Sequence, residues 1–443
     1  MKNILMAGLL ITTGAAVFAQ TLNLEQARVL ALANSRSLAR YELSIRSSIL
    51  DEKSQLYSML PSISAGYSAS ADYLRDWVIV NPVDTFSAGA SFSVTQIIFQ
   101  GGKGFIQRAI TAIATESVRI DALAEYFNVL DSIDNAYYAA LEASAALSAE
   151  ESSLRSANMA FSIANIRKEG GMLNQGDYLK ALSDVESREN SYNQARRNLA
   201  LSMAKLKILT GISGTVELEP VDFSAYEGVL TRLAVISDED SGALYEKFLV
   251  KVRASNPDFA RTLLNNKRAE KSHTLTVRDY APTITATIFG TGFNYSTLGG
   301  YSSSSTGGVS IRGTIPVDFR LLNNKLERSR IALESAAMDY KNAELSLETE
   351  LQTALLSIFS QAGSVLSARR SLDYMEKHYQ FILERYRLLQ SSVSELVDAG
   401  TLLINSSNSY ISGSYGFLRG LSRLRSLTAL DDEKKILEML SEN

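Results

Sequence analysis

The chain contains 443 residues, carries a formal net charge of −4 and has no cysteine. This nearly balanced charge, without a long basic run, argues against nucleic acid as a partner. A scaffold held by disulfides is excluded, so the fold must be stabilised by packing or by assembly.

The first 19 residues have the pattern of a secretory signal peptide. Lys2 supplies a positive charge, residues 4–11 are mostly apolar, and residues 17–19 form an acceptable cleavage site. Gln20 follows this site in place of a cysteine, so we expect no lipoprotein anchor. The alternative is an ordinary buried N-terminal segment. Beyond this region no apolar run reaches the roughly 20 residues of a transmembrane helix, so a membrane-spanning form would need a closed β-barrel.

Two long stretches show the periodicity of α-helices. Residues 105–169 contain neither glycine nor proline over 65 positions, and residues 321–390 are interrupted only by Gly363. At about 1.5 Å per residue the first would be roughly 100 Å long, which predicts coiled-coil-like packing against a long partner. Shorter helices are expected at residues 22–57, 177–209 and 244–277.

Alternation of apolar and polar residues predicts two β-hairpins. In residues 62–73 and again in 86–98, serine and glycine alternate with apolar or aromatic side chains. A second pair is expected within residues 283–316, with a bulge where the alternation changes phase near Phe289. About 10 residues per strand is the length that a transmembrane β-barrel requires. A soluble sandwich is the alternative, but four strands are too few to cover one another. The loop of the first hairpin contains Asp76, Trp77, Asn81, Pro82 and Asp84.

The order helix, hairpin, long helix and return helix occurs twice. Leu60-Pro61 matches Ala281-Pro282 at an offset of 221, and Phe99 matches Phe319 at 220. This indicates a duplicated α-β-β-α unit. The predicted segments are a signal peptide at 1–19, a first repeat at 20–214, an equatorial linker at 215–242, a second repeat at 243–430 and a C-terminal tail at 431–443. The first repeat is expected to contain a hairpin at 62–98, a long helix at 103–168 and a return helix at 174–210. The second is expected to contain a hairpin at 283–316, a long helix at 320–388 and a return helix at 392–428.

The sequence Gly101-Gly102-Lys103-Gly104 raises the alternative of a phosphate-binding loop. Such a loop needs a glycine five residues before its Gly-Lys pair and a hydroxyl residue after it, and those positions hold Ile97 and Gly104. We therefore interpret the glycines as a sharp strand-to-helix transition. Lys103 is expected to reach toward lipid headgroups. The residues assigned to the strand–helix junctions are Pro61, Phe99, Gly101, Gly102, Pro282 and Phe319.

Several segments resemble the TolC-like outer membrane efflux protein family over nearly the whole mature chain. They are "LNLEQARVLALANSRSL" near the N-terminus, "LPSISAGYS" and "FSVTQIIFQGGK" around the first hairpin, and "SNPDF" and "YAPTITAT" in the second repeat. Two further segments, "KEGGMLNQGDYLKA" and "YRLLQSSVSELVDA", match the periplasmic tip of the family more loosely. Their order, spacing and duplication carry the resemblance.

The resemblance implies an α+β membrane protein, assembled as a homotrimer in the outer membrane. Each copy would give four strands to a 12-stranded transmembrane β-barrel, and the long helices would form a coiled-coil α-helical barrel across the periplasm. The expected function is a passive exit duct of a tripartite efflux or type I secretion system, working with a periplasmic adaptor (membrane fusion) protein and an inner-membrane pump. No cofactor, no metal and no nucleic acid are expected.

Two other classes of function compete with this one. The first is a periplasmic coiled-coil scaffold without a pore, which would have no use for paired hairpins of membrane-spanning length. The second is an enzyme, which the sequence disfavours because it has no cysteine, no nucleophile motif and two isolated histidines, His273 and His378, without metal-ligand spacing.

The family match also suggests site residues. The second tip turn holds Leu389 where the family usually has glycine, which puts its geometry in question. Acidic residues near both tip turns could form a ring at the pore constriction that favours cations, or could simply cap helices. The tip candidates are Glu169, Gly170, Gly171, Asp177, Leu389, Glu395 and Asp398. The residues expected to face the barrel lumen are Ser64, Ser68, Ser91, Ser93, Thr95, Ser310 and Arg312.

Overall fold

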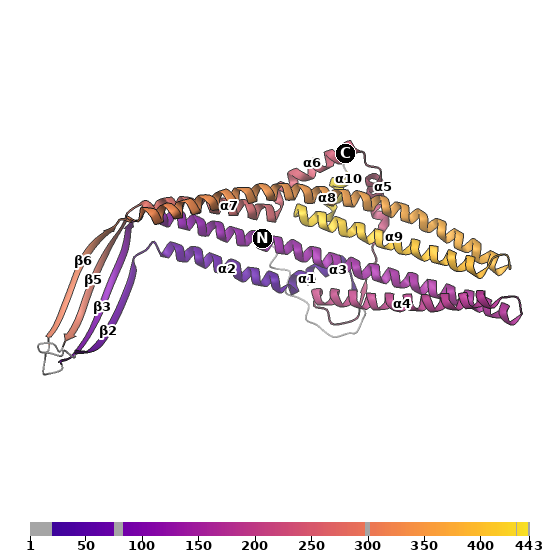
Figure 1. Cartoon of the computed structure of the whole chain (residues 1–443), viewed down its shortest axis with the longest axis horizontal. Coiled ribbons are helices and arrows are strands. Elements are labelled where there is room, and N and C mark those ends of the chain that lie inside the picture. The colour runs from indigo at the N-terminus through magenta and orange to yellow at the C-terminus, as the bar shows by residue number, and fades with distance from the viewer. Residues whose placement is uncertain (1–19, 75–82, 297–301, 431, 442–443) are drawn as a thin grey trace. The chain divides into compact units, whose positions relative to one another are not determined.

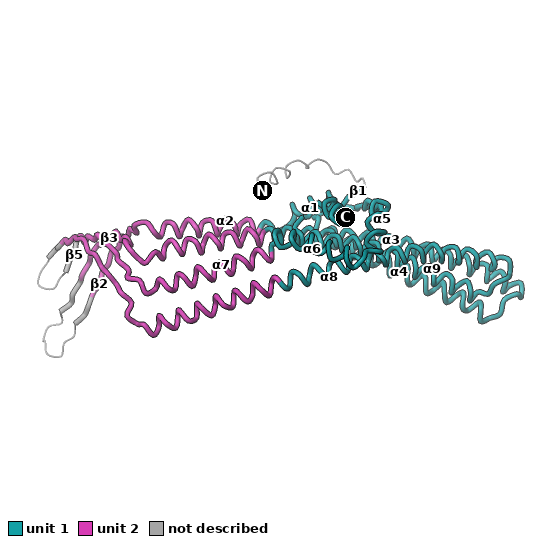
Figure 2. The backbone as a smooth tube through the Cα atoms, turned by 90° about the horizontal axis from the view of Figure 1, so that it is seen from above, with its two compact units in different colours: residues 1–39, 123–257, 345–443 teal, residues 40–122, 258–344 magenta. Residues whose placement is uncertain are grey.

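A computed structural model describes residues 20–74, 83–296, 302–430 and 432–441 (Figure 1). The predicted signal peptide and residues 76, 77, 81 and 82 of the first hairpin loop lie outside the described residues. Within them the chain forms two compact units, coloured separately in Figure 2. Unit 1 contains residues 1–39, 123–257 and 345–443, and unit 2 contains residues 40–122 and 258–344.

Unit 2 contains a four-stranded antiparallel sheet. Its strands are β2 (Ser62–Leu74), β3 (Val83–Phe99), β5 (Thr283–Ser296) and β6 (Ser302–Thr314), in the order β2-β3-β5-β6. Each half of the chain supplies one hairpin, and pairing of β3 with β5 joins the two. Strands β2 and β6 therefore form the two edges.

The sheet is continuous at the position where a bulge was expected. Phe289 pairs with Ser93 and with Gly308 in unbroken register, and the shift between β5 and β6 lies further on, between Thr291 and Asn294. Strand β5 therefore does contain an irregularity, but it begins about two residues after the expected position, because Phe289 itself keeps the alternation of the strand.

The helices of unit 2 belong to α2 (Arg36–Tyr57), α7 (Pro257–Val277) and the first parts of α3 (Lys103–Glu169) and α8 (Phe319–Arg387). Helices α3 and α8 have 67 and 69 residues, so each is continuous over many turns. The absence of proline and the scarcity of glycine explain this, because those residues interrupt helices most strongly.

Unit 1 holds the remaining parts of α3 and α8 with α1 (Leu24–Asn34), α4 (Gln175–Thr210) and α9 (Val393–Thr428). Shorter elements are α5 (Glu227–Ala234), α6 (Asp238–Ser255), α10 (Glu433–Ser441) and the parallel strands β1 (Gln20–Leu22) and β4 (Val216–Leu218). Helix α10 lies in the segment expected as a tail, and its Ile436 and Leu440 are fully buried.

Two helices expected as single elements are each divided. The stretch 22–57 breaks at Ser35, whose hydroxyl accepts a hydrogen bond from the Leu38 backbone at 3.3 Å and so caps α2. The stretch 244–277 breaks between α6 and α7, where Pro257 occupies the first helical position.

Candidate functional site

One face of the sheet is lined with hydroxyl groups. Paired residues in an antiparallel sheet project to the same side. Ser64 and Ser93 have their hydroxyl oxygens 2.7 Å apart, and Thr95 and Thr287 have theirs 3.2 Å apart. Together with strand alternation, the register places all seven residues predicted for the lumen on this one face, namely Ser64, Ser68, Ser91, Ser93, Thr95, Ser310 and Arg312. We call it the polar face.

The opposite face is apolar and uncovered in a single chain. Tyr67 is 93% exposed and Ile311 is 72% exposed, and Ile63, Ile288 and Val309 are also exposed. A contiguous apolar surface of this kind marks a site that contacts lipid or another protein. We call it the apolar face.

Phe289 lies on the polar face, a placement that the sequence analysis missed. A Cβ atom built on Gly308 would lie 3.1 Å from the Cζ atom of Phe289, so this ring packs directly over the glycine. An aromatic ring commonly covers a cross-strand glycine in this way. The signal was present in the sequence, because Phe289 continues the two-residue spacing of Thr283, Thr285 and Thr287.

The strand–helix junction requires glycine for steric reasons. Gly101 and Gly102 have φ values of 66° and 77°, and a Cβ on Gly101 would lie 2.4 Å from the Cβ of Ala281. Ala281 precedes Pro282, and Pro61 likewise comes just before strand β2. Phe99 and Phe319 are exposed at this junction. Lys103 pairs with Asp279 at 2.8 Å, a protein contact in place of the expected reach toward lipid.

The two tip turns, at Gly171 and Leu389, share one backbone geometry. The amide of Met172 donates to the Arg167 carbonyl at 2.8 Å, and the amide of Gln390 donates to the Arg385 carbonyl at 2.8 Å. Both are Schellman motifs, which need a left-handed residue after the helix. Gly171 has φ 72° and Leu389 has φ 65°. Leu389 thus adopts the conformation of the glycine it replaces.

The acidic tip candidates make local contacts. The backbone amides of Asp177 and Glu395 donate to the side chains of Asn174 and Ser392, which cap α4 and α9. Glu169 accepts a hydrogen bond from Asn165 at 3.0 Å. Asn174 and Ser392 are thus the N-cap residues, and Asp177 and Glu395 lie in the first turns of α4 and α9, where a negative charge is favourable. The acidic ring concerns several copies of the chain and stays a prediction.

Cations and a core cluster connect helices at the tip. Lys180 on α4 lies 3.6 Å from a carboxylate oxygen of Asp398 on α9. Arg167 on α3 donates to the Tyr386 carbonyl, and its guanidinium carbon lies 4.0 Å from the centre of the Tyr386 ring. Gly170 directly follows α3, and its amide donates to the Ile166 carbonyl at 3.0 Å. Apolar residues of α3, α4, α8 and α9 form a shared core below the turns, comprising Ala164, Ala181, Tyr379, Ile382, Leu383, Tyr386, Val393, Leu396 and Ala399.

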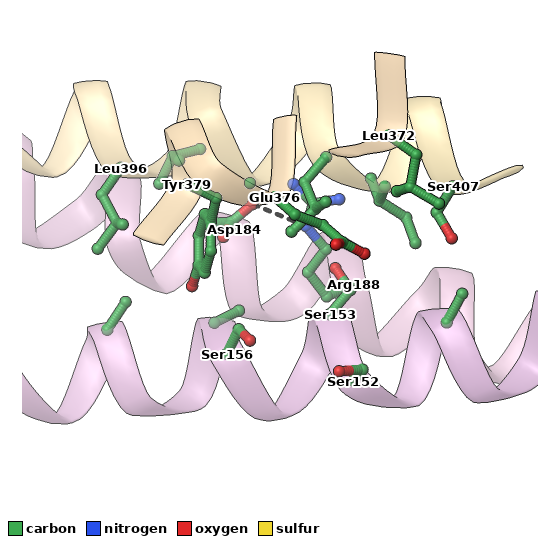
Figure 3. Close-up of a pocket in the computed structure, with 17 residues that line it drawn as sticks. Ser152, Ser153, Ser156, Asp184, Arg188, Leu372, Glu376, Tyr379, Leu396 and Ser407 are labelled. Atoms are coloured by element: carbon green, nitrogen blue, oxygen red, sulfur yellow. Dashed lines mark hydrogen bonds and ion pairs between the residues drawn. The ribbon is translucent and has the colours of Figure 1, made fainter. Parts of the chain in front are cut away.

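A cavity of about 240 Å³ lies among the same four helices (Figure 3). An ion pair of Arg188 with Asp184, at 3.1 Å, lines it, and Arg188 also donates to the Thr401 hydroxyl at 2.7 Å. Ser152, Ser153 and Ser156 of α3 face the pair across the cavity (Figure 3).

A buried charge cluster connects four segments of unit 1, and sequence reasoning did not find it. Asp134 is fully buried, and its carboxylate accepts from Arg28 at 2.7 Å and from Arg425 at 2.7 Å. Arg28 also lies 3.4 Å from Glu433 of α10. Burial raises the pKa of the neighbouring Asp131, and burial raises that of Tyr137 to about 12.

The potential metal-ligating side chains of the described residues are dispersed. No group of three or more His, Cys, Asp or Glu side chains among them is arranged to hold a metal ion. His273 lies 2.9 Å from the Ser329 hydroxyl, a local contact between α7 and α8. Among all the helices of the described residues, none combines the length and apolar character needed to cross a membrane.

Comparison with known proteins gives a family match and several similar folds. The family model for outer membrane efflux proteins matches residues 27–212. No curated protein matches the sequence. The Campylobacter jejuni CmeC outer membrane channel superposes with a TM-score of 0.77 at 16% identity, covering 95% of this chain and 89% of that one.

Two other solved structures agree. The outer membrane protein VceC from Vibrio cholerae has a TM-score of 0.72 at 14% identity, with 91% of this chain and 96% of that chain covered. The Neisseria gonorrhoeae MtrE outer membrane channel has a TM-score of 0.72 at 15% identity, with 94% and 93% covered. The resemblance read from the sequence is confirmed, and so is the fold class of long helices with a β domain.

Proposed function

Because this chain resembles outer membrane efflux proteins in sequence and fold, we propose that it is a passive exit duct in the outer membrane. Three copies would assemble, and their strands would close one 12-stranded barrel. The duct would conduct substrates delivered by a periplasmic adaptor and an inner-membrane pump, with no chemistry of its own. The similar structures are described as channels, which supports a non-enzymatic role.

The amphipathic sheet is the observation that carries this proposal. Its polar face is lined by serine, threonine and glycine, and its apolar face is exposed. A single four-stranded sheet leaves both edges and both faces without a partner from the described residues of its own chain. In a trimer within lipid, each edge strand would pair with a strand of a neighbouring copy, and the apolar face would contact hydrocarbon.

A periplasmic scaffold without a pore is the competing function. It would bury the apolar face against protein in water, so its assembly would not need detergent. Light scattering of the full-length protein extracted from membranes, corrected for bound detergent, separates the two. We expect the mass of three chains, and only when detergent is present. A protein that stays soluble without detergent, as a monomer or as an assembly, would contradict the duct and favour the scaffold.

Conductance provides the functional readout. The trimer reconstituted in a planar lipid bilayer should give discrete current steps. Ile311 on the apolar face and Ser310 on the polar face are adjacent residues whose side chains project in opposite directions. If the polar face lines the lumen, a water-soluble thiol reagent should change the current steps of Ser310→Cys and leave those of Ile311→Cys unchanged. The opposite sensitivity would exclude a lumen on the polar face.

A further inference from the structure

Arg312 is the single charged residue on the polar face, among the sheet residues whose side chains the structure describes. It pairs with Thr285 on β5, and its neighbours on the same face of β6 are Ser310 and Thr314. The other polar-face residues whose side chains the structure describes are serines, threonines and glycines, with Phe289 and Ile97, while Asp72 takes a register position on this face at the opposite end of the sheet. A fixed charge in such a neutral surface dominates the local electric potential.

The Arg312 side chain is exposed and has no counter-charge. No ion pair within the described residues includes this side chain. The backbone carbonyl of Arg312 accepts a hydrogen bond from the Thr285 hydroxyl at 3.5 Å. Of the acidic residues at the adjacent junction, Asp279 pairs with Lys103 at 2.8 Å and Asp318 accepts from the Leu321 amide at 3.1 Å. Arg312 is therefore a full positive charge directed into solvent on the polar face.

Its position along the strand is also defined. Arg312 lies two residues before the end of β6, and its partner Thr285 is the third residue of β5. At about 3.3 Å per residue this places it within roughly 10 Å of the strand ends that lead into the helices. The charge lies at one level of the sheet, near its helical end.

We propose that Arg312 shifts the ion selectivity of the duct toward anions by forming a ring of three positive charges at the helical end of the barrel lumen. The inference rests on the proposed trimeric duct. Rings of basic side chains favour anions in pores. Anionic solutes would be enriched at this level, and cations would be depleted.

Salt concentration must control the effect. The Debye length is about 8 Å at physiological ionic strength and about 30 Å at 0.01 M. In a wide lumen three charges are largely screened at high salt and act across the whole opening at low salt. The preference for anions should therefore grow as salt is diluted.

Reversal potentials test the proposal. The full-length protein would be placed in a planar bilayer under a tenfold KCl gradient, at dilute and at concentrated salt. We expect Arg312→Gln to shift the permeability ratio toward potassium by about twofold or more at dilute salt, and much less at concentrated salt. Lys434→Gln is the matched control, because it removes the same charge from an exposed site on α10. An unchanged reversal potential in Arg312→Gln at dilute salt would refute the ring.

A cysteine variant, modified chemically after the channel has assembled, separates the effect of the charge from any effect of the substitution on folding. The chain has no cysteine, so Arg312→Cys offers a single thiol. Its thiolate attacks a methanethiosulfonate reagent, forms a disulfide and releases methanesulfinate, all on a channel already conducting. A cationic reagent should restore anion preference and an anionic reagent should reverse it. Modification that leaves selectivity unmoved overturns the inference while the duct stands, whereas a wild type without current steps overturns the duct itself.

Discussion

Leu389 shows how a single residue can hold an unfavourable conformation. A left-handed backbone costs a residue with a Cβ atom about 1–2 kcal/mol, and glycine avoids this cost. At the first turn nothing lies within 4 Å of a Cβ added to Gly171, so only the backbone conformation opposes substitution there. The two turns have the same hydrogen bonds, which makes them an internal comparison.

Substitutions at the two turns should therefore have unequal effects on stability. Gly171→Ala should lower the free energy of unfolding by about 1 kcal/mol. Leu389→Gly should change it by less than about 0.5 kcal/mol, because relief of strain offsets the greater flexibility of the unfolded chain. Thermal unfolding followed by circular dichroism would measure both. A Gly171→Ala protein as stable as the wild type would show that the turn tolerates a Cβ.

Asp134 neutralises two buried arginines, so its removal should be severe. Breaking a buried ion pair from one side costs about 3–5 kcal/mol, because the remaining charge stays out of water without a partner. Asp134→Asn is expected to reach this range in thermal or denaturant unfolding. Arg46→Gln is the control, since its pair with Glu42 is exposed and should contribute well under 1 kcal/mol. Equal effects of the two substitutions would contradict the structural role of Asp134.

At the scale of elements, the sheet offers a direct test of which face meets lipid. Ile311→Arg places a charge on the apolar face, at a cost of about 2–4 kcal/mol if the site is near the bilayer midplane. Ser310→Arg places the same charge one residue away on the polar face, where water is expected. We predict that the first variant fails to assemble in the outer membrane and the second assembles normally, as measured by the amount of trimer in detergent extracts. Loss of both would mean that the two faces do not differ in environment.

The contact between α3 and the strands β1 and β4 depends on a neutral tyrosine. The Tyr137 hydroxyl donates to the Leu22 carbonyl at 3.0 Å and lies 2.9 Å from the Glu219 carbonyl. Its pKa is raised from 10 to about 12, mainly by burial. A raised pKa means that this contribution to stability is complete below pH 10 and is lost as the pH rises through 12.

Alkaline unfolding would measure this contribution. The thermal midpoint of the wild type should fall between pH 10 and 12. Tyr137→Phe should be less stable than the wild type below pH 10, by about 1 kcal/mol in the free energy of unfolding, because its hydrogen bonds are lost. Its thermal midpoint should then fall less between pH 10 and 12. Tyr138 and Tyr226 also have raised pKa values through burial, so part of the fall remains in the variant. Parallel curves for the two proteins would contradict the assignment to Tyr137.

Elements of this protein differ in how readily the sequence predicts them. The absence of glycine and proline predicts α3, and the serine alternation predicts β2 and β3, because both signals are local and long. The break at Ser35 has no such signal, since serine also occurs inside helices. Asn34 reaches the Ile208 carbonyl at 3.4 Å, a contact 174 residues away that no local pattern reports.

For the whole molecule, the duplication was predictable and the interior polar contacts were not. Offsets near 220 residues between the halves indicate two copies of one unit whatever their packing. The cluster of Arg28, Asp134 and Arg425 joins residues that lie 106 or more positions apart, so periodicity cannot pair them. The lumen and tip assignments came from family resemblance together with alternation, and they remain predictions about an assembly of several chains.

The proposed ring of acidic residues can be tested on the assembled protein. Asp398→Cys introduces one thiol per chain at an exposed tip position. If three copies meet near the axis, a short bifunctional maleimide should link two chains into a product of doubled mass on a denaturing gel. Glu151→Cys on α3 is the control, because it is exposed and lies outside the tip turns. Efficient single labelling of Asp398→Cys without a linked product would place these residues away from the axis.

The edge strands β2 and β6 have a consequence for the life of the chain before it assembles. Each presents a row of backbone amides and carbonyls that another strand can join, and the apolar face beside them is exposed. Under the proposed function, a newly exported copy would be competent for aggregation until it met two others, and the formation of trimers would depend steeply on concentration. If the chain is exported as proposed, slow export should increase the fraction lost to proteolysis, and holdase chaperones should determine its yield more than its intrinsic stability does.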